Sequence, residues 1–529
     1  MPEQNRARYK IWEPMLLAMV AVIGMIAGVK LSGEHATSFR ILPMDDRSNA
    51  GKITELIRFI EEKYVDDVDS ERLVQKAIES VISELDPHSS FIPADELAKL
   101  NERMEGHFEG IGIEFHIVKD TITVLDITEG GPADRAGVLP HDRIISADDS
   151  TLVGIALNEE LVVERLRGPK GSAVEIRVKR HRVDTLIPLT IVRDRIPLVS
   201  VDAGYMLDDQ TGYIRVNRFS STTYREFMDK LESLIHGEGM QHLVIDLRQN
   251  PGGYLKEAVN ILSQLFKEKG RLLVYTEGAH VKRMDYESTG NPFYEVGNVA
   301  VLIDGGSASA SEIIAGAIQD QDRGVIIGTK SFGKGLVQEQ YALKNGGALR
   351  LTTARYYTPS GRSIQTPYRN GDAVDHHEEA DSSGYQTRNG REVFGSGGIV
   401  PDIIIEPGFD WYKPELQGLY ESVLEFAFYG YKQIHPRDYA SVEDLIKHFP
   451  DRELVLSSLI AYWDRTTPDW QYRQTVRENW DQGYLLLQAM IGSYFFGREA
   501  WYKIMNEHDP VVIQARESVK QDRRTTLKI

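Results

Sequence analysis

The 529-residue chain contains no cysteine, and this absence removes several kinds of chemistry. Disulfide bonds, catalysis by a thiolate and zinc sites with cysteine ligands are all excluded. Positive charge is also scarce, because 61 Lys and Arg residues stand against 79 Asp and Glu residues, a formal net charge of −18. We therefore expect no nucleic-acid partner, since phosphate binding requires clustered basic residues. No motif indicates a metal or another cofactor, and we predict none.

Long apolar runs are equally rare, and the notable one lies near the N-terminus. Arg6, Arg8 and Lys10 precede the apolar run Met15–Val29. A basic flank before an apolar stretch is typical of exported proteins, with the basic flank remaining inside. We predict that residues 1–33 form a cytoplasmic stub and a single-pass anchor in the inner membrane, with the rest of the chain in the periplasm. A cleaved signal that releases a secreted form is the alternative.

The rest of the chain is too long for one ordinary domain. After a polar linker, its periodicity and composition predict a helical region, a β region, a mixed α/β region and a helical, aromatic extension. Their predicted bounds are 50–105, 106–194, 195–408 and 409–529. Five of the six tryptophans lie in the last region, where they form either a hydrophobic core or a platform for sugars or peptides.

The predicted elements of the β and α/β regions alternate along the chain. A helix is expected at 93–105, and a closing hairpin at 172–179 and 186–192. Further expected strands are 121–124, 212–216, 242–247, 299–303 and 324–327, and further expected helices are 222–236, 255–269 and 311–320. The polar, Gly-rich segment Gly371–Ser396 is expected to be a mobile surface loop.

One predicted strand, Val299–Ile303, runs into the segment Asp304–Glu312, which is rich in glycine and serine and opens a helix. Such a turn exposes a side chain with little crowding, and the free N–H groups at the helix start favour negative charge. A serine here is a candidate nucleophile, with the Ala310 amide as a candidate oxyanion donor. Alternatively, Ser309 and Glu312 form an ordinary capping box.

A serine nucleophile needs a base. None of the 14 histidines sits in a recognisable motif, so lysine is the remaining candidate. Lys334 lies between Gly333 and Gly335, after Phe332, which we expect to shield the amine. The pKa of a lysine must fall from about 10.4 to roughly 7–8 for this role, and burial lowers it. Gln338 is suited to orient the amine without adding charge.

A second Gly-rich turn follows the predicted strand His242–Leu247. It contains Pro251, Gly252 and Gly253. This is either a plain βα turn or, through the exposed amides of Gly252 and Gly253, the source of the other oxyanion donor.

Several segments, in this order, resemble the carboxy-terminal processing (tail-specific) protease family of serine peptidases. They are Leu85–Ser89, Asp246–Gly253, Gly306–Glu312, Phe332–Gly335, Tyr357–Gln365 and Gly397–Asp402. The resemblance spans about residues 50–408 and implies a mixed α/β core of the crotonase/ClpP-like kind. It implies that Ser309, and not Ser307 or Ser311, is the nucleophile. It also implies that Lys334, 25 residues later, is the base and that Gln338 completes a triad. Asp320 matches a family aspartate that we interpret as structural.

The resemblance also implies a PDZ domain that binds peptide tails. Gly110, Ile111, Gly112 and Ile113 resemble its carboxylate-binding loop, beside which a substrate with a free C-terminus adds as a strand. Arg167 matches a family arginine linked to coupling between this domain and the active site.

The sequence therefore predicts an α/β multi-domain serine endopeptidase that processes or degrades exported proteins from their C-terminal regions. The competing hypothesis is an inactive, PDZ-bearing scaffold on a protease-like core. A His-dependent protease is a third class, and no motif supports it. We expect the C-terminal extension to serve helical packing or homodimer formation.

Overall fold

The structure is a computed structural model. It describes residues 49–521 except 119, 155–156, 181–182, 345, 370–371, 374–383, 396, 407, 409–412, 414–415, 432–437 and 468. The chain forms two compact units, Met1–Ile78 and Glu79–Ile529. The predicted anchor at residues 1–33 lies outside the described residues. None of the helices within the described ranges has both the length and the apolar character needed to cross a bilayer.

The N-terminal helical region is more divided than its periodicity predicts. It contains α2 (Asn49–Lys63), α3 (Ser70–Ser83), the short strand β1 (Ser90–Ile92) and α4 (Ala94–Glu105). Helix α3 ends before the predicted break at Asp86-Pro87, and α4 matches the helix expected at 93–105. Strand β1 was not expected, because its three residues carry too little pattern to be recognised.

The β region forms a five-stranded antiparallel path in the order β3-β4-β5-β7-β8, with β6 added to β5. Its strands are β2 (His107–Gly110), β3 (Ile113–Val118), β4 (Thr121–Ile127), β5 (Arg143–Ala147), β6 (Ser150–Thr151), β7 (Ala173–Lys179), β8 (Ile187–Val192) and β9 (Asp194–Pro197), and its helices are α5 (Pro132–Arg135) and α6 (Glu159–Leu166). Strands β7 and β8 form the predicted hairpin. Strand β2 pairs with β9, so the region closes on itself where the chain enters and leaves it.

The α/β region is built on a six-stranded sheet in the order β10-β11-β12-β15-β16-β23. These strands are β10 (Val201–Met206), β11 (Thr211–Val216), β12 (His242–Asp246), β15 (Val299–Ile303), β16 (Val325–Gly328) and β23 (Ile403–Ile404). All neighbours are parallel except β10 and β11. Because β12, β15 and β16 are adjacent and parallel, the turns that follow them meet at one edge of the sheet.

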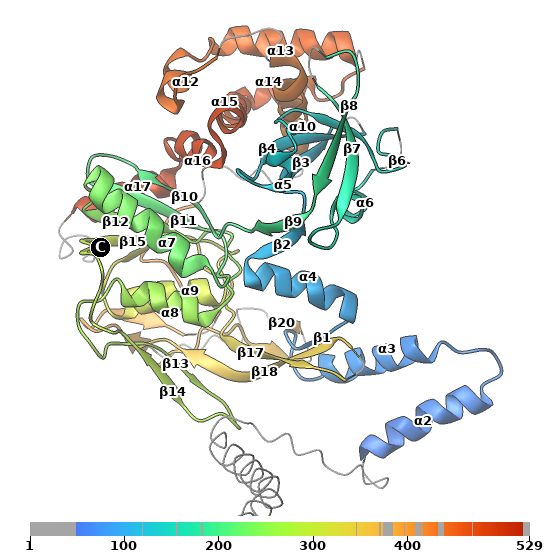
Figure 1. The fold of residues 1–529 in the computed structure, drawn as a ribbon. Coiled ribbons are helices and arrows are strands. Elements are labelled where there is room, and N and C mark those ends of the chain that lie inside the picture. The colour runs from blue at the N-terminus through green and yellow to red at the C-terminus, as the bar shows by residue number, and fades with distance from the viewer. Residues whose placement is uncertain are drawn as a thin grey trace, which may run out of the picture. The chain divides into compact units, whose positions relative to one another are not determined.

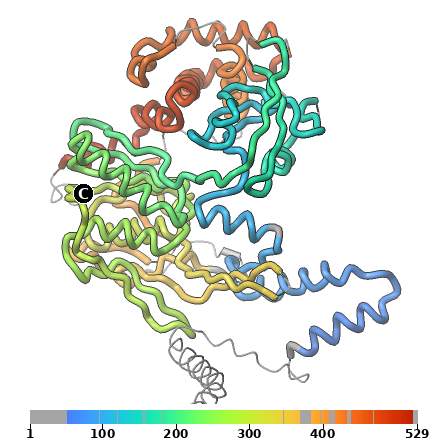
Figure 2. The backbone as a smooth tube through the Cα atoms, in the orientation of Figure 1, coloured from blue at the N-terminus to red at the C-terminus, as the bar shows by residue number. Residues whose placement is uncertain are grey.

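Helices cover both faces of this sheet (Figure 1). One face carries α7 (Thr223–Glu232), which continues into a π-type turn at Ser233–Gly237, together with α8 (Leu255–Ser263) and α9 (Ala310–Asp320). Every residue of α9 is buried. The other face carries α17 (Pro510–Lys520), through which the C-terminal end of the chain returns to the green strands of the sheet (Figure 2).

A second sheet flanks the first. Its strands are β13 (Leu272–Glu277), β14 (Met284–Glu287), β17 (Leu336–Ala342) and β18 (Ala348–Tyr357), joined by β1. Strand β18 pairs with β17 along most of its length, with β1 at its start and with β13 at its end. Strand β1 therefore brings the segment that precedes it close to β17 and β18.

Two predicted elements of the α/β region were wrong. The helix expected at 255–269 ends at Ser263, because the Gln264 and Leu265 amides bond to carbonyls three residues back, and this turn buries Leu265. The segment 371–396 is not a plain loop where it is described. Within it, β20 (Asp372–Ala373) pairs with β19 (Tyr368–Arg369), which precedes the segment, and β21 (Gly384–Gln386) pairs with β22 (Glu392–Phe394). The Asn389-Gly390 turn was the available signal for the second hairpin.

The C-terminal region is helical, as predicted, and its tryptophans serve its core. It contains α10 (Gln417–Glu425), a π-type turn at Phe426–Tyr431, α12 (Val442–His448), α13 (Arg452–Thr466), α14 (Arg473–Glu478), α15 (Trp480–Phe496), α16 (Arg498–Asn506) and α17. Trp463, Trp470 and Trp480 are buried in one hydrophobic cluster, which supports the core interpretation. Trp411 lies outside the described residues.

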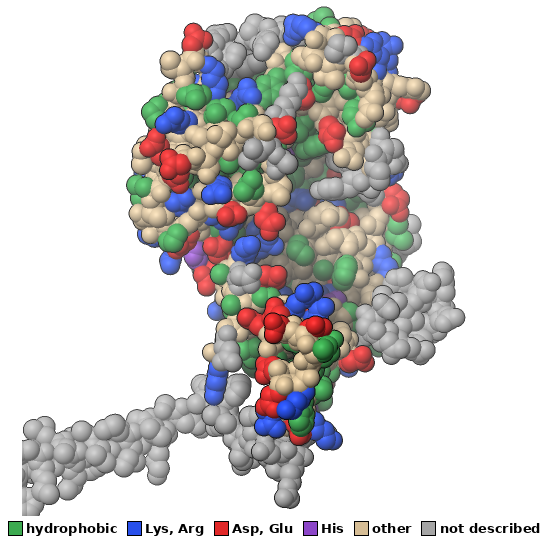
Figure 3. Space-filling model, turned by 90° about the vertical axis from the view of Figure 1, so that its right-hand side faces the viewer, with side chains coloured by type: hydrophobic (Ala, Val, Ile, Leu, Met, Phe, Trp, Pro, Cys, Tyr) green, Lys and Arg blue, Asp and Glu red, His purple; other side chains and the backbone are tan. Residues whose placement is uncertain are grey.

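Helix α16 connects this region to the two others. Arg498 forms an ion pair of 2.8 Å with Glu114 on β3 and one of 3.3 Å with Asp202 on β10. Elsewhere on the surface, acidic and basic side chains are interspersed on the face that Figure 3 shows.

Candidate active site

Ser309 occupies the turn between β15 and α9, at the carboxyl edge of the sheet. Its backbone has φ 55° and ψ −111°, a conformation that residues other than glycine rarely adopt. Such strain is typical of functional sites that the surrounding structure holds in place. Ser307 and Ser311 are fully buried, and their hydroxyls donate to the Leu247 carbonyl (2.8 Å) and the Asn250 carbonyl (2.9 Å). Ser309 is therefore the partly exposed member of the three serines.

Lys334 lies in the turn after β16, next to the Ser309 turn. The turns are joined by the Phe332 amide, which donates to the Ser307 carbonyl at 3.0 Å. Gly333 has φ 90°, and a Cβ there would lie 2.2 Å from the Thr366 hydroxyl, so this position requires glycine. Phe332 is 54% exposed, which does not favour the prediction that it shields the amine.

The carboxylate of Glu312 ties the serine and lysine turns together. It is fully buried and accepts four hydrogen bonds. One oxygen accepts from the amides of Ser309 (2.8 Å) and Lys334 (2.9 Å). The other accepts from the amide of Gly333 (2.7 Å) and the hydroxyl of Ser331 (2.6 Å). Burial raises the pKa of Glu312, and the four hydrogen bonds oppose that rise.

Tyr356 on β18 provides a second link between the same turns. Its hydroxyl lies 3.1 Å from the Ser309 carbonyl and also contacts the Lys334 carbonyl. Burial raises the pKa of Tyr356 well above its ordinary value, so the phenol remains a hydrogen-bond donor. Sequence reasoning treated Glu312 only as a possible helix cap and missed Tyr356, because no local pattern predicts contacts between turns that are distant in sequence.

The amine of Lys334 is half-buried, and Nζ donates to Gln338 Oε1 at 2.9 Å. Burial lowers the pKa of Lys334, and the Arg350 charge lowers it further, whereas Asp86 and Glu312 oppose the change. In the described part of the chain, no ion pair links Lys334 to a carboxylate and no hydrogen bond joins Nζ to Ser309 Oγ. The structure thus brings Lys334 and Gln338 into direct contact and links Lys334 to Ser309 through Glu312 and Tyr356.

The Gly-rich turn after β12 lies directly against the serine turn. A Cβ on Gly252 would lie 2.8 Å from Ser309 Cβ and 2.9 Å from the Ala310 nitrogen. As an oxyanion donor, however, Gly252 was a wrong choice for this structure, because its amide donates to Asn250 Oδ1 at 2.9 Å. The amides of Gly253 and Ala310 have no acceptor among the described residues and remain the candidate donors.

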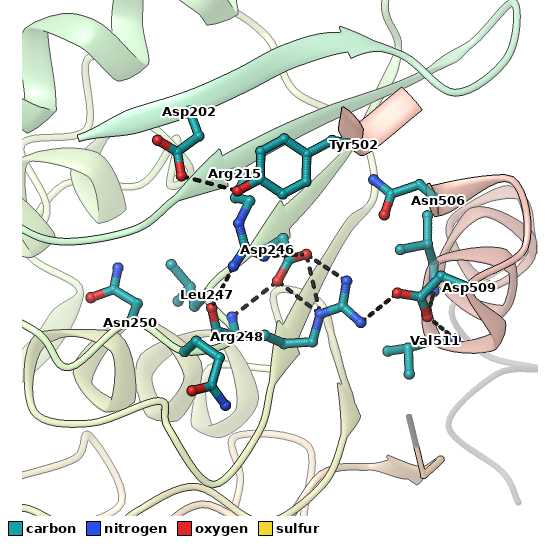
Figure 4. Close-up of polar contacts among 12 residues, drawn as sticks. Asp202, Arg215, Asp246, Leu247, Arg248, Asn250, Tyr502, Asn506, Asp509 and Val511 are labelled. Carbon is teal, nitrogen blue, oxygen red and sulfur yellow. Dashed lines mark hydrogen bonds and ion pairs between the residues drawn. The ribbon is translucent and has the colours of Figure 1, made fainter. Parts of the chain in front are cut away.

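A buried charge cluster supports this turn from behind (Figure 4). Asp246 is fully buried at the end of β12 and contacts Arg215 (3.0 Å) and Arg248 (2.7 Å). Burial opposes its ionisation, but the Arg248 and Arg215 guanidiniums hold the pKa of Asp246 well below its usual range. Arg248 also pairs with Asp509 at 2.6 Å. Asp509 caps α17, so the C-terminal helix anchors the turn that carries Gly253.

Asp320 and Arg167 each form an ion pair that joins parts of the fold. Asp320 forms a buried ion pair of 2.7 Å with Arg362, in line with its structural interpretation. Arg167 pairs with Glu102 on α4 at 2.7 Å and stacks over the Phe108 ring. It therefore lies where the β region joins α4.

The predicted carboxylate loop lies between β2 and β3. Gly112 has φ 77°, and the amides of Ile111 and Gly112 have no acceptor among the described residues. Gly110 ends β2, and Ile113 begins β3. Among the described strands, β3 pairs with β4 alone, so its other edge has no partner strand there.

Comparison with known proteins identifies the family. Residues 210–374 match the sequence profile of peptidase family S41, and residues 110–191 match that of the PDZ domain. A carboxy-terminal-processing protease of Bartonella bacilliformis is 36% identical over 353 residues, which cover 65% of this chain and 80% of the relative. The chain belongs to peptidase family S41. The resemblance predicted from the motifs is thereby confirmed.

Other S41 relatives are similar over a comparable length. A probable CtpA-like serine protease of Staphylococcus aureus is 32% identical over 378 residues, covering 71% of this chain and 72% of the relative. Among solved structures, the photosystem II D1 C-terminal processing protease is 26% identical, covers 67% of this chain and 92% of its own, and has a TM-score of 0.36. The two family profiles and the sequence relatives together identify a PDZ domain within a member of the S41 family of C-terminal processing serine proteases.

Proposed function

We propose that this S41 protein is an active serine endopeptidase that cleaves exported proteins from their C-terminal regions with a Ser309–Lys334 dyad and Gln338. The observation that carries the proposal is the buried Glu312 carboxylate, one oxygen of which accepts the amides of both Ser309 and Lys334. This contact holds the two turns at a fixed separation. In the reactive state, the flexible lysine side chain places its amine beside the serine hydroxyl while Gln338 orients it.

In the proposed reaction, neutral Lys334 takes the proton of the Ser309 hydroxyl while Oγ forms a bond to the carbonyl carbon of the scissile peptide. The amides of Ala310 and Gly253 stabilise the resulting oxyanion. Lys334 then donates its proton to the leaving amine as the C–N bond breaks. Water hydrolyses the acyl-enzyme, with Lys334 taking a proton from the water and Ser309 regaining one. The lowered pKa of Lys334 supports this role, because more of its amine is neutral near neutral pH.

For substrate selection, we propose that a free C-terminus docks in the PDZ domain. Its carboxylate binds the amides of Ile111 and Gly112, and its backbone adds to the open edge of β3. We also propose that the apolar N-terminal run anchors the enzyme in the inner membrane with its catalytic part in the periplasm. Membrane fractionation of the full-length protein, with and without residues 1–33, tests the anchor.

The decisive experiment compares full-length wild type with Ser309→Ala, Lys334→Ala and Ser307→Ala. A peptide phosphonate should label Ser309 in the wild type, and cleavage of an unstructured protein should stop in the first two variants. Ser307→Ala serves as the matched control and should retain activity if it folds. A folded wild type that neither cleaves nor takes the label would favour the inactive scaffold instead.

A further inference from the structure

A short turn before β1 contacts Gln338, the residue that binds the amine of the base. Its contact residue, His88, lies 250 residues before Gln338 in the sequence. The turn, Asp86–Ser89, is internally tied. Asp86 accepts the amides of His88 (2.8 Å) and Ser89 (2.7 Å) and the Ser89 hydroxyl (2.6 Å). The side chain of Asp86 is buried, and so is that of Ser89. The turn therefore has one well-defined conformation.

This turn is also docked on the second sheet. Strand β1 follows it directly and pairs with the start of β18. The Thr352 amide donates to the Ser89 hydroxyl at 3.1 Å, beside the Asp86 contact. Strand β18 also pairs with β17, which carries Gln338. This pairing fixes the position of the turn relative to that glutamine.

The turn contacts the catalytic group through a backbone atom. Gln338 Nε2 donates to the His88 carbonyl at 2.5 Å, while Gln338 Oε1 accepts from Lys334 Nζ at 2.9 Å. A carbonyl can only accept, so the His88 contact selects the amide orientation in which the Gln338 oxygen faces the amine. One N–H bond of a neutral lysine then points at Gln338, and its lone pair is left for the serine proton.

The turn also places charge near Lys334. The groups that act on the amine are Asp86 and His88 from the turn, Arg350 from β18 and Glu312 from α9. Asp86 is the member of this set that both builds the turn and favours the ammonium form. Its carboxylate is held by its own turn and does not form an ion pair with the amine.

We propose that the Asp86–Ser89 turn is a positioning element for the base: the His88 carbonyl fixes the Gln338 amide, and the amide orients the Lys334 amine. The proposal rests on the proposed Ser309–Lys334 function. None of the turn residues is assigned to the reaction itself: His88 acts through Gln338, and Asp86 builds the turn and also acts on the amine through its charge.

Two variants separate the two effects of the turn. Ser89→Ala loosens the turn and keeps its charge. The kcat should fall by roughly tenfold, which is part of the 10²–10⁴-fold that a positioned base contributes. The acid limb of the pH profile should stay unchanged. Asp86→Asn should lower kcat and also move the acid limb to lower pH, because the lost carboxylate favoured the ammonium form. Asp208→Asn is the matched control, since Asp208 also accepts two turn amides at 3.0 Å, in the β10–β11 turn.

A second measurement does not depend on cleavage. In the Ser309→Ala protein, trace acetic anhydride labels neutral amines, and mass spectrometry compares Lys334 with the exposed Lys344 at each pH. Adding Asp86→Asn should move the onset of Lys334 labelling to lower pH, and adding Gln338→Glu should move it to higher pH. Asp208→Asn should leave it unchanged.

The inference is overturned if the Asp86→Asn substitution leaves the labelling of Lys334 identical at every pH, or if folded Ser89→Ala retains wild-type kcat. Thermal unfolding checks that each variant folds, and Gln338→Glu remains informative if the turn variants do not, because it removes the donor to the His88 carbonyl and changes no residue of the turn. Cleavage that persists in Ser309→Ala would instead refute the proposed function. The labelling ratios would still report how the turn acts on Lys334.

Discussion

The buried carboxylate of Glu312 allows a sharp prediction, because its four hydrogen-bond donors are divided evenly between its two oxygens. In Glu312→Gln, one oxygen becomes an NH2 group. The amide then loses either the pair from Ser309 and Lys334 or the pair from Gly333 and Ser331, whichever way it is turned. Two hydrogen-bond donors then face an NH2 group that cannot accept from them. The serine and lysine turns separate on the side that has lost its hydrogen bonds.

The expected loss follows from these contacts. Each hydrogen bond to a charged group contributes about 1.5–3 kcal/mol, so two lost bonds correspond to about 3–6 kcal/mol. Removing a buried charge returns part of this, which leaves a net fall of about 3 kcal/mol in the free energy of unfolding. Because a shift of about 1 Å at a catalytic group can lower the rate by roughly 100-fold, kcat/KM should fall by at least that factor.

The measurement is denaturant unfolding and peptide cleavage for the full-length variant, with Glu257→Gln as the control. Glu257 is also a buried carboxylate, but the amide that it accepts, at 2.9 Å, is that of Tyr224 on α7 and not one from the serine or lysine turn. Its variant should be less destabilised and should keep most of its activity. Equal losses of activity in the two variants would show that Glu312 acts only as a generic buried carboxylate, and the argument from its shared oxygen would be refuted.

Three other changes test the site. The lowered pKa of Lys334 means that its charge destabilises the folded protein below that pKa, and that this destabilisation is lost as pH rises towards the pKa of unfolded lysine. Lys334→Met should therefore remove a rise in the free energy of unfolding with pH. Wild-type and variant plots of this free energy against pH that run parallel would contradict the prediction. Gly252→Ala should abolish phosphonate labelling of Ser309, since its φ is 96° and the added methyl group meets the serine turn; normal labelling would show that the turn can move aside. Asp509→Asn removes the charge that α17 offers to Arg248 and leaves Arg248, among the described residues, only its Asp246 partner, so calorimetry should show a loss of about 1–3 kcal/mol in stability together with a lower kcat; unchanged kcat would mean that α17 does not support the turn.

The sequence revealed those parts of the site that depend on local order along the chain. Ser309 and Lys334 each follow a strongly apolar strand, so their turns and a mixed sheet with covering helices were predictable, while the choice of Ser309 among the three serines came from the family resemblance. The partners of these turns were not, because Glu312 meets Lys334, and Tyr356 meets both turns, only after separate strands have paired. Gly252 was misassigned for a similar reason, since a sequence cannot show that the Asn250 side chain occupies its amide.

Helix α9 constrains how activity can be regulated. Every residue from Ala310 to Asp320 is enclosed by protein, so displacing the nucleophile at its first turn would require opening a close-packed interior. The base side is different, because Gln338 lies on β17, whose residues are mostly part-exposed or exposed. An inactive form of this enzyme would therefore keep Ser309 where it is and withdraw the amine. An effector that withdraws the amine would then act differently on two covalent probes. It would spare labelling by a probe that needs only a correctly folded serine turn, and it would reduce labelling by a probe that needs the base.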